Sequence, residues 1–170
     1  METLSFHNTP HSPPTLELVI NTHSLSLCSQ LRWPAMLTFA VGTVPLPSRR
    51  TFSLPGTICQ AAGWGQTGVT DPLSNTLREV NLRLMDDEVC NHFLFYDHGL
   101  QMCVGDPRMA GSAFKGDSGG PLLCAGVAQG IVSYTNQNAQ PTVIFTQIFS
   151  YMPWIKKVLK GQVATEAWPA

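Results

Sequence analysis

The sequence predicts an all-β protein whose length suits a single domain. Its 170 residues are enough to build a single hydrophobic core. Charged residues make up only 12% of the chain, while 14 glycines and 13 prolines supply many turns, a composition typical of β-rich secreted proteins. Apolar residues at Val80, Leu82 and Leu84 alternate with polar ones, which is the period of a half-buried strand.

Charge and hydropathy exclude two classes of partner. The formal net charge is −1, which argues against a general nucleic-acid or polyanion binder. No apolar run approaches the ~20 residues needed to span a bilayer, so we expect no membrane contact. We also expect no metal and no cofactor.

The first 33 residues are expected to be mostly irregular. Pro, Ser, Thr, His and Asn predominate there, and the one short apolar patch runs from Leu16 to Ile20. The histidines of this segment, His7, His11 and His23, are interpreted as solvated side chains without a catalytic role.

A β-rich pattern begins at Pro34. Acidic residues open the segment 86–93, which predicts a short helix there. The expected strands are 58–65, 80–84, 102–105, 120–125, 127–134 and 142–146.

The C-terminal segment 151–160 predicts an amphipathic helix. Trp154 and Val158 fall on its apolar face, while its lysines fall on the other face and suit the negative end of the helix dipole. Residues 161–170 are expected to form a loose tail.

The most specific motif of the chain is Gly116-Asp117-Ser118-Gly119-Gly120-Pro121. A serine flanked by glycines suits a nucleophile on a tight turn, because glycine adopts backbone angles that other residues avoid. Such a turn also lets the N–H groups of Gly116 and Ser118 point at one spot where an oxyanion could form. The alternative is a simple glycine-serine turn between two strands.

At these residues the chain resembles the chymotrypsin-like serine endopeptidases (peptidase S1), and within them the mast-cell chymase, granzyme and cathepsin G group. The resemblance runs from about Pro34 to Lys160. It implies the C-terminal six-stranded antiparallel β-barrel of the chymotrypsin fold, followed by a C-terminal helix. Residues 1–33 are not covered, so the N-terminal barrel of the family is expected to be missing. The segments with the strongest resemblance are 62–65, 77–86, 110–115 and 127–134.

The resemblance implies a site for peptide-bond hydrolysis. Ser118 would be the nucleophile, and the N–H groups of Gly116 and Ser118 would form the oxyanion hole. In the family a newly cleaved N-terminal amine pairs with the aspartate before the nucleophile, here Asp117. Without that amine Asp117 must find another partner, and we expect the turn to be zymogen-like or mobile.

The implied specificity pocket consists of Ser112, Ser133, Thr135 and Val143. Serine at position 112, where an aspartate would select Lys or Arg, suits a neutral side chain before the scissile bond. Thr135 and Val143 occupy positions that are small in a typical chymase, so Leu or Val is expected to be preferred over Phe and Tyr. The alternative is that loop adjustments leave room for Phe.

The general base of the family has no counterpart in the sequence. No segment matches the catalytic histidine motif or the buried aspartate motif, and His92 and His98 are interpreted as surface side chains. Because serine is a poor nucleophile without a base, the chain as it stands is expected to be inactive. Two alternatives remain: a non-catalytic binding or decoy module, and an unstable truncated product that exposes an apolar face.

Five cysteines suggest an oxidising compartment but leave one cysteine over. The resemblance implies the disulfides Cys59–Cys124 and Cys90–Cys103, and Cys28 has no evident partner. Secretion or storage in secretory granules is implied by the family, whereas the first residues show no signal peptide, which argues against export of this product. The partners implied by the family are peptide or protein substrates, serine protease inhibitors and heparin-like glycosaminoglycans.

Overall fold

The computed structural model describes residues 3–5, 16–21, 26–31, 34–68, 70–105, 113, 115–135, 142–160 and 166–167. The chain divides into two compact units. The larger unit is Pro45–Ser150, and the smaller unit combines Met1–Val44 with Tyr151–Ala170.

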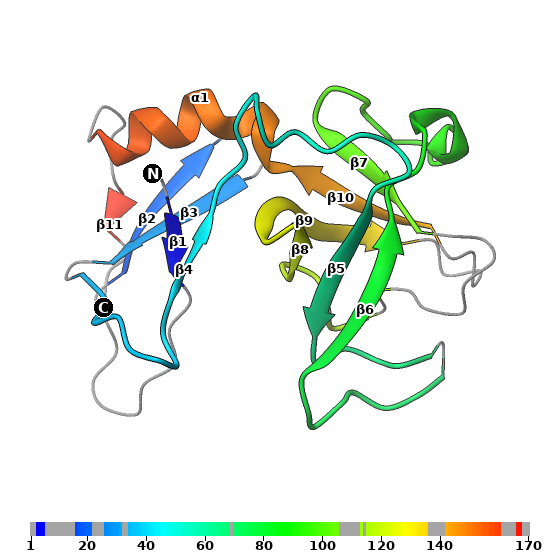
Figure 1. The fold of residues 1–170 in the computed structure, drawn as a ribbon, viewed down its shortest axis with the longest axis horizontal. Helices are drawn as coiled ribbons and strands as arrows, with labels where there is room; N and C mark the ends of the chain where they lie inside the picture. The colour runs from blue at the N-terminus through cyan, green and yellow to red at the C-terminus, as the bar shows by residue number, and fades with distance from the viewer. Residues whose placement is uncertain are drawn as a thin grey trace. The chain divides into compact units, whose positions relative to one another are not determined.

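The larger unit is built on one six-stranded antiparallel sheet (Figure 1). Its strands lie in the order β6-β5-β8-β9-β10-β7. A bridge between Leu84 and Val104 joins the ends of the two outermost strands, so the sheet closes on itself as a barrel. This confirms the predicted six-stranded barrel. The strands are β5 (Ile58–Gly63), β6 (Arg78–Arg83), β7 (Gln101–Val104), β8 (Pro121–Cys124), β9 (Val127–Thr135) and β10 (Val143–Gln147).

Alternation of apolar residues fills the interior of the barrel. Leu82 of β6 and Leu122 of β8 are almost completely buried, while their neighbours along each strand are more exposed. Strand β10 is different, because Val143, Ile144 and Phe145 are all fully buried. Val143 and Phe145 belong to the core of the barrel, and Ile144 packs in a second cluster on the other face. Both faces of β10 are therefore covered, which explains its continuous apolar run.

Both disulfides implied by the resemblance are present. Cys59–Cys124 links the neighbouring strands β5 and β8, and Cys90–Cys103 links η1 (Asp87–Cys90) to β7. Each typically contributes about 2–4 kcal/mol to the free energy of unfolding.

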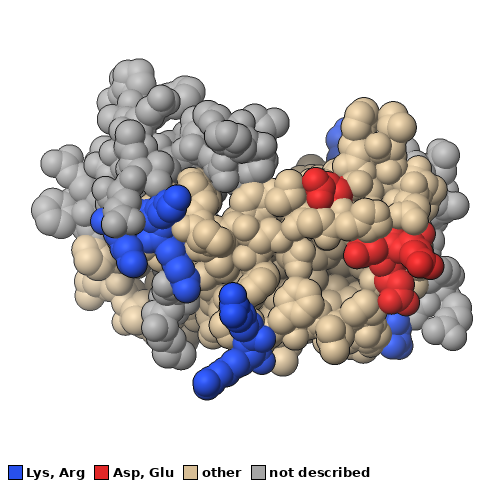
Figure 2. Space-filling model, turned by 90° about the horizontal axis from the view of Figure 1, so that it is seen from above, with Lys and Arg blue, Asp and Glu red and all other residues tan. Residues whose placement is uncertain are grey.

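The helix predicted over 86–93 is shorter than expected. Only Asp87–Cys90 is helical, as a 3₁₀ turn, and the preceding Asp86 makes no side-chain capping hydrogen bond. The backbone carbonyl oxygen of Asp86 accepts from the N–H of Val89 over 3.0 Å, but the side chain of Asp86 adds no cap, and the chain continues as a series of turns. Figure 2 shows that acidic side chains cluster on the molecular surface.

The smaller unit contains short strands that the sequence did not predict. A three-stranded sheet has the order β11-β2-β3, and β1 pairs with β4. The irregular segment expected at 1–33 and the loose tail expected at 161–170 thus both contribute strands. Strands β2 and β3 pair locally, but none of these short runs shows the clear alternation that indicates a strand, and the partners of β1 and β11 lie far away in sequence. The strands are β1 (Thr3–Ser5), β2 (Leu16–Asn21), β3 (Ser26–Leu31), β4 (Thr43–Pro45) and β11 (Glu166–Ala167).

The predicted C-terminal helix is present as α1 (Ile148–Leu159), which begins three residues earlier than expected. Met152 and Val158 are buried, whereas Lys156 and Lys157 are exposed in its last turns, as the amphipathic pattern predicts. Within the described ranges, no helix combines the length and apolar character that a membrane span requires.

Candidate active site

The turn that carries Ser118, residues 115–120 and hereafter the serine turn, is fixed to the barrel by backbone hydrogen bonds. The N–H of Gly119 donates to the carbonyl oxygen of Val132 in β9 over 2.9 Å, and the N–H of Val132 donates to Gly120 over 2.9 Å. Gly116 has a φ of +100°, in the region that favours glycine. Ser118 itself is exposed, so its hydroxyl is accessible to a substrate.

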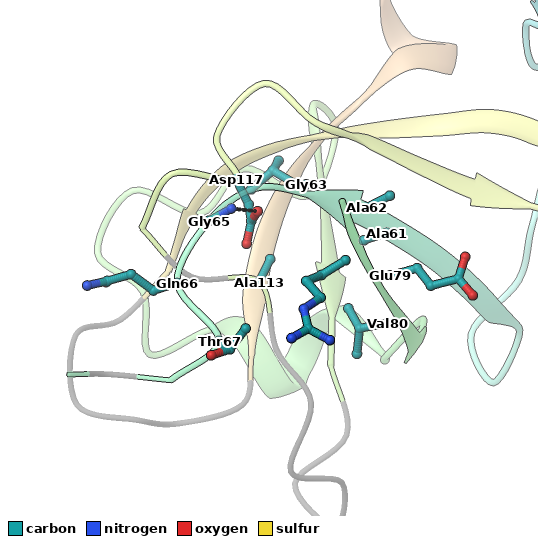
Figure 3. A pocket seen from close by; sticks show the side chains of 12 residues that line it. Ala61, Ala62, Gly63, Gly65, Gln66, Thr67, Glu79, Val80, Ala113 and Asp117 are labelled. Carbon is teal, nitrogen blue, oxygen red and sulfur yellow. Dashed lines mark hydrogen bonds between the residues drawn. The ribbon is translucent and has the colours of Figure 1, made fainter. Parts of the chain in front are cut away.

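Asp117 directs its carboxylate against the end of β5 (Figure 3). Its Oδ1 accepts a hydrogen bond of 2.8 Å from the N–H of Gly65. A Cβ atom on Gly63 would lie 2.0 Å from that oxygen, and one on Gly65 would lie 2.5 Å from it. A side chain at either position would therefore displace the Asp117 carboxylate. We expected Asp117 to find a partner in place of an N-terminal amine, and the backbone N–H of Gly65 is such a partner. The zymogen-like character of the turn stays a prediction.

A cavity of about 320 Å³ opens beside Asp117 (Figure 3). Ala61, Val80 and Ala113 provide apolar walls, and Arg78 and Glu79 provide charged groups. The cavity suits an apolar residue whose cationic group lies next to the Asp117 carboxylate.

The residues assigned to the specificity pocket are only partly described. Thr135 of β9 and Val143 of β10 lie opposite each other in register. The hydroxyl of Thr135 donates to the carbonyl oxygen of Thr142 over 3.2 Å, and Val143 is fully buried. Ser133 is half-buried in the same strand as Thr135, and Ser112 lies outside the described residues.

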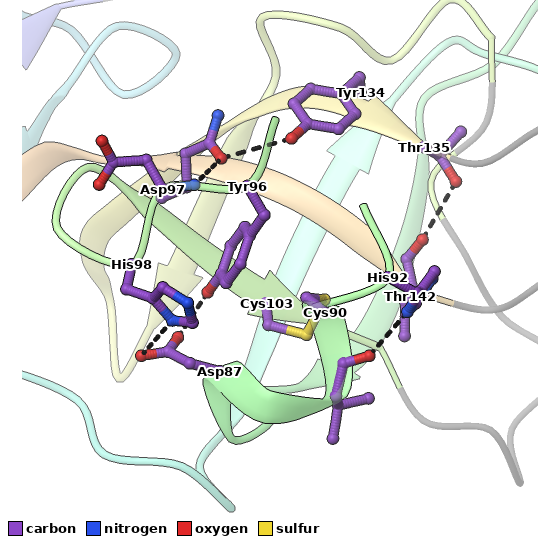
Figure 4. The surroundings of a disulfide bond; sticks show 12 residues. Asp87, Cys90, His92, Tyr96, Asp97, His98, Cys103, Tyr134, Thr135 and Thr142 are labelled. Atoms are coloured by element: carbon purple, nitrogen blue, oxygen red, sulfur yellow. Dashed lines mark hydrogen bonds and ion pairs between the residues drawn. A yellow bond between two sulfur atoms is a disulfide. The ribbon is translucent and has the colours of Figure 1, made fainter. Parts of the chain in front are cut away.

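The histidines of the larger unit have partners other than Ser118. Nδ1 of His92 donates to the carbonyl oxygen of Val89 over 2.9 Å. Nδ1 of His98 lies 3.6 Å from Oδ2 of Asp87 (Figure 4). Among the hydrogen bonds of the described residues, none joins either imidazole to Ser118. The other three histidines, His7, His11 and His23, lie outside the described residues.

Asp87 also accepts a hydrogen bond from the hydroxyl of Tyr96 (Figure 4). Partial burial raises the pKa of Tyr96 strongly, and the hydrogen bond and negative charge of Asp87 raise it further. Burial also raises the pKa of Tyr134, which lies next to Thr135 in β9. Both phenols therefore stay neutral at physiological pH.

A family model described as Trypsin matches residues 26–155. The chain belongs to the trypsin family. Within this family it is 60% identical over 132 residues to the chymase of Papio hamadryas. This match covers 78% of this chain and 53% of that protein. It is 58% identical over 141 residues to mast cell protease 2 of Ovis aries, which covers 83% of this chain and 57% of that protein.

The matching regions extend further toward the N-terminus than expected. The chymase of Canis lupus familiaris is 54% identical over 155 residues, 91% of this chain and 61% of that protein. At most 15 of the 170 residues then lie outside the match, so part of the segment 1–33 is matched. The expectation that the resemblance leaves all of 1–33 uncovered is therefore wrong. The polar composition of the segment concealed this similarity.

Solved structures agree with this trypsin-family assignment. The structure titled "Structure of GrC" has a TM-score of 0.73 and 36% identity, and the match covers 83% of this chain and 64% of that one. The chain spans a little more than half the length of the curated relatives that it matches.

Sequence reasoning missed the role of Gly63 and Gly65. Both glycines are expected from the sequence only as part of the strand 58–65. Two glycines at alternate positions often mark a close approach of another group, and that signal was available. The partner, Asp117, lies 52 residues away from Gly65 along the chain.

Proposed function

We propose that this chain carries the nucleophile-bearing half of a chymase-type serine endopeptidase. The observation that supports the proposal best is the serine turn, which exposes Ser118 and is fixed by Asp117 and β9 in a chain that is 60% identical to a chymase. In the proposed reaction the hydroxyl oxygen of Ser118 bonds to the scissile carbonyl carbon. The N–H groups of Gly116 and Ser118 stabilise the resulting oxyanion until the C–N bond breaks.

The proton of the Ser118 hydroxyl must pass to a base as the C–O bond forms, and later to the departing amine. His92 and His98 are both engaged elsewhere. We therefore propose that residues 1–170 alone are catalytically inactive. Losing the base forfeits most of the rate, leaving at best the ~10³–10⁴-fold acceleration that the oxyanion hole and substrate binding supply.

We also propose that the cavity beside Asp117 receives a cationic N-terminal amine. The carboxylate lies at the wall of this cavity, and the apolar side chains of Ala61, Val80 and Ala113 would surround the first residue of the inserted segment. The ion pair would compensate Asp117 for the solvent that insertion removes. In this proposal the amine orders the serine turn, as the resemblance implies.

The proposed substrates are peptides and proteins with a small aliphatic side chain before the scissile bond. Thr135 and Val143 lie opposite each other in register, so two branched side chains come from neighbouring strands at this point. Secretion or granule storage agrees with the two disulfides, because disulfides persist in oxidising compartments. Serine protease inhibitors would bind the same surface as substrates.

A non-catalytic binding module is the second candidate. It is favoured by the same geometry: the serine turn is held in place although neither His92 nor His98 is bonded to Ser118. Such a chain could bind a substrate or an inhibitor without cleaving it.

The test compares residues 1–170 with a complete protein, made by joining this chain to the part of a chymase relative that the chain does not span. Both are incubated with peptide substrates and with a sulfonyl fluoride, which labels only an activated serine. We expect hydrolysis and labelling at Ser118 in the complete protein, loss of both in Ser118→Ala, and neither in residues 1–170. Ser48→Ala, at another exposed serine, is the matched control.

Two outcomes would contradict these proposals. Turnover by residues 1–170 that Ser118→Ala abolishes would show that the chain alone is active. A complete protein with an intact Ser118 but no turnover would contradict the protease function and favour the binding module.

The preference for small side chains has its own test in the complete protein. Thr135→Gly should raise kcat/KM for Phe substrates relative to Leu substrates by about 10–200-fold, as expected for a methyl-sized change in a pocket. An unchanged ratio would mean that Thr135 does not line the pocket.

A further inference from the structure

We propose that Leu73 is a positioning residue for the oxyanion hole, and that the described residues of the loop carrying it, 66–68 and 70–73, hold the serine turn in place. This inference rests on the proposed function, which gives the N–H of Gly116 its role. It adds a residue from another part of the chain to the machinery around Ser118.

The contact between Leu73 and Gly116 carries the proposal. A Cβ atom on Gly116 would lie 2.7 Å from Cδ2 of Leu73 and 2.9 Å from Cα of Gly65. Gly116 is therefore packed between a leucine side chain and the backbone at the end of β5. These two neighbours leave no room for a side chain at position 116.

This packing matters because the backbone at Gly116 has a φ of +100°, a conformation that glycine adopts without restraint from a side chain. Glycine has more backbone freedom than any other residue. The peptide that donates the Gly116 N–H is restrained at its carbonyl oxygen, on Lys115, by the N–H of Gln66, and Leu73 adds a steric contact at Gly116 itself. An oxyanion hole works only if its donors are already oriented before charge develops.

Backbone hydrogen bonds fix the ends of the 66–73 loop relative to the serine turn. The N–H of Gln66 donates to the carbonyl oxygen of Lys115 over 2.9 Å, directly before Gly116. Gln66 also forms an antiparallel bridge with Leu73. The N–H of Ser74 lies 3.2 Å from the carbonyl oxygens of both Trp64 and Gly65. These hydrogen bonds therefore connect the segment that carries Leu73 both to the serine turn and to the end of β5.

Asp71 supports the loop from inside. Its carboxylate accepts a hydrogen bond of 2.7 Å from the hydroxyl of Thr67, and its carbonyl oxygen accepts one of 2.7 Å from the side-chain amide of Gln66. These bonds hold the two sides of the loop together. Loss of the Asp71 carboxylate should therefore loosen Leu73 without removing its contact with Gly116.

A surface leucine with no role is the simpler interpretation. Leu73 is 60% exposed, so it adds little to the core. Leu77 is similar, at 57% exposed, but it is not among the atoms nearest to Gly116. Leu77→Ala is therefore a matched control that removes an equally exposed leucine outside this contact.

The experiment measures ¹⁵N relaxation order parameters in residues 1–170, without substrate. We expect the order parameter of the Gly116 N–H to be lower in Leu73→Ala than in the wild-type chain, while the Gln66–Lys115 hydrogen bond keeps it above about 0.6, the range of a flexible backbone. Leu73→Met should retain the wild-type value, and Asp71→Ala should give an intermediate one. Leu77→Ala should change nothing at Gly116.

The N–H of Leu84, which donates to Thr57 in another part of the barrel, reports on general loosening. An unchanged Gly116 in Leu73→Ala, or an equal fall at Leu84, would overturn the proposal. If Leu73→Ala does not fold, Leu73→Val takes its place, because its shorter side chain also loses the Cδ2 contact. The relaxation experiment does not depend on turnover, so its result is separate from the test of the proposed function. If Leu73→Ala loosens Gly116 but the complete protein is inactive, the proposed function is contradicted and the contact between Leu73 and Gly116 is established.

Discussion

Two regions of the barrel contain acidic residues in contact with other polar groups, and they differ in what holds the acid. In the serine turn, Asp117 accepts from the backbone N–H of Gly65, against two glycines at which a side chain would displace its carboxylate. In the loop between β6 and β7, Asp87 contacts the side chains of Tyr96 and His98. The first arrangement orients a neighbouring backbone, whereas the second joins only exposed or partly exposed side chains.

The comparison shows that residue types alone do not make an active site. The Asp87–His98 pair has the same residue types that orient a serine in this family, but it lines a cavity of about 190 Å³ that shares no lining residue with the one beside Asp117. Ser118 has the fixed turn but neither imidazole of the larger unit as its partner. Each region also has its own disulfide, so the two can be disturbed separately.

The largest expected effect comes from those disulfides. Replacing both Cys59 and Cys124 by alanine should lower the free energy of unfolding by about 4 kcal/mol, against about 3 kcal/mol for Cys90 and Cys103, because the longer loop gains more entropy when released. The bridges span 65 and 13 residues. Urea unfolding monitored by tryptophan fluorescence measures both. Equal losses, or a larger one for Cys90–Cys103, would contradict the ranking.

A smaller effect is expected at the contact between β5 and Asp117. Gly63→Ala places a methyl group against the carboxylate and should destabilise the fold by about 1–3 kcal/mol. Gly42→Ala is the control, because nothing lies within 4 Å of a Cβ there. That change should be neutral or stabilise by about 0.4–1 kcal/mol. A Gly63→Ala protein as stable as Gly42→Ala would show that Asp117 moves away freely.

The smallest effect concerns Tyr96 in the Asp87 loop, and it depends on pH. The pKa of Tyr96 is raised in the folded state from its ordinary value of 10.0, so its contribution to stability is complete below pH 10. Above pH 10 the unfolded chain releases this proton more readily, and stability should decline as the pH rises. Tyr96→Phe cannot ionise and should show a shallower decline, with the rest coming from groups such as Tyr134.

Thermal unfolding between pH 9 and pH 11.5 measures this slope. An identical slope in Tyr96→Phe would mean that ionisation of Tyr96 is not linked to unfolding.

The features that could be predicted from the sequence are those indicated by the local pattern of apolar residues or by a short motif. The alternation of Val80, Leu82 and Leu84 predicted a strand of the barrel, and the fixed spacing of the Ser118 motif predicted a tight turn. The sequence did not predict that Gly63 and Gly65 would contact Asp117, because such a contact depends on how distant segments pack. The strand at Glu166–Ala167 was missed for the same reason, since its partner β2 is distant in sequence. Strands β2 and β3 pair locally, and they were missed because neither run shows a clear alternation of apolar and polar residues.

Closure of the barrel at Leu84 and Val104 has a consequence for self-association. Exposed edge strands present free N–H and C=O groups that can pair with another chain. Here the N–H of Met85 donates to Cys103 and the N–H of Gly105 donates to Arg83, both over 2.9 Å, so the ends of β6 and β7 bond to each other. A second molecule that added a strand at this point would first have to break both bonds, which favours a monomeric barrel over sheet-to-sheet polymers.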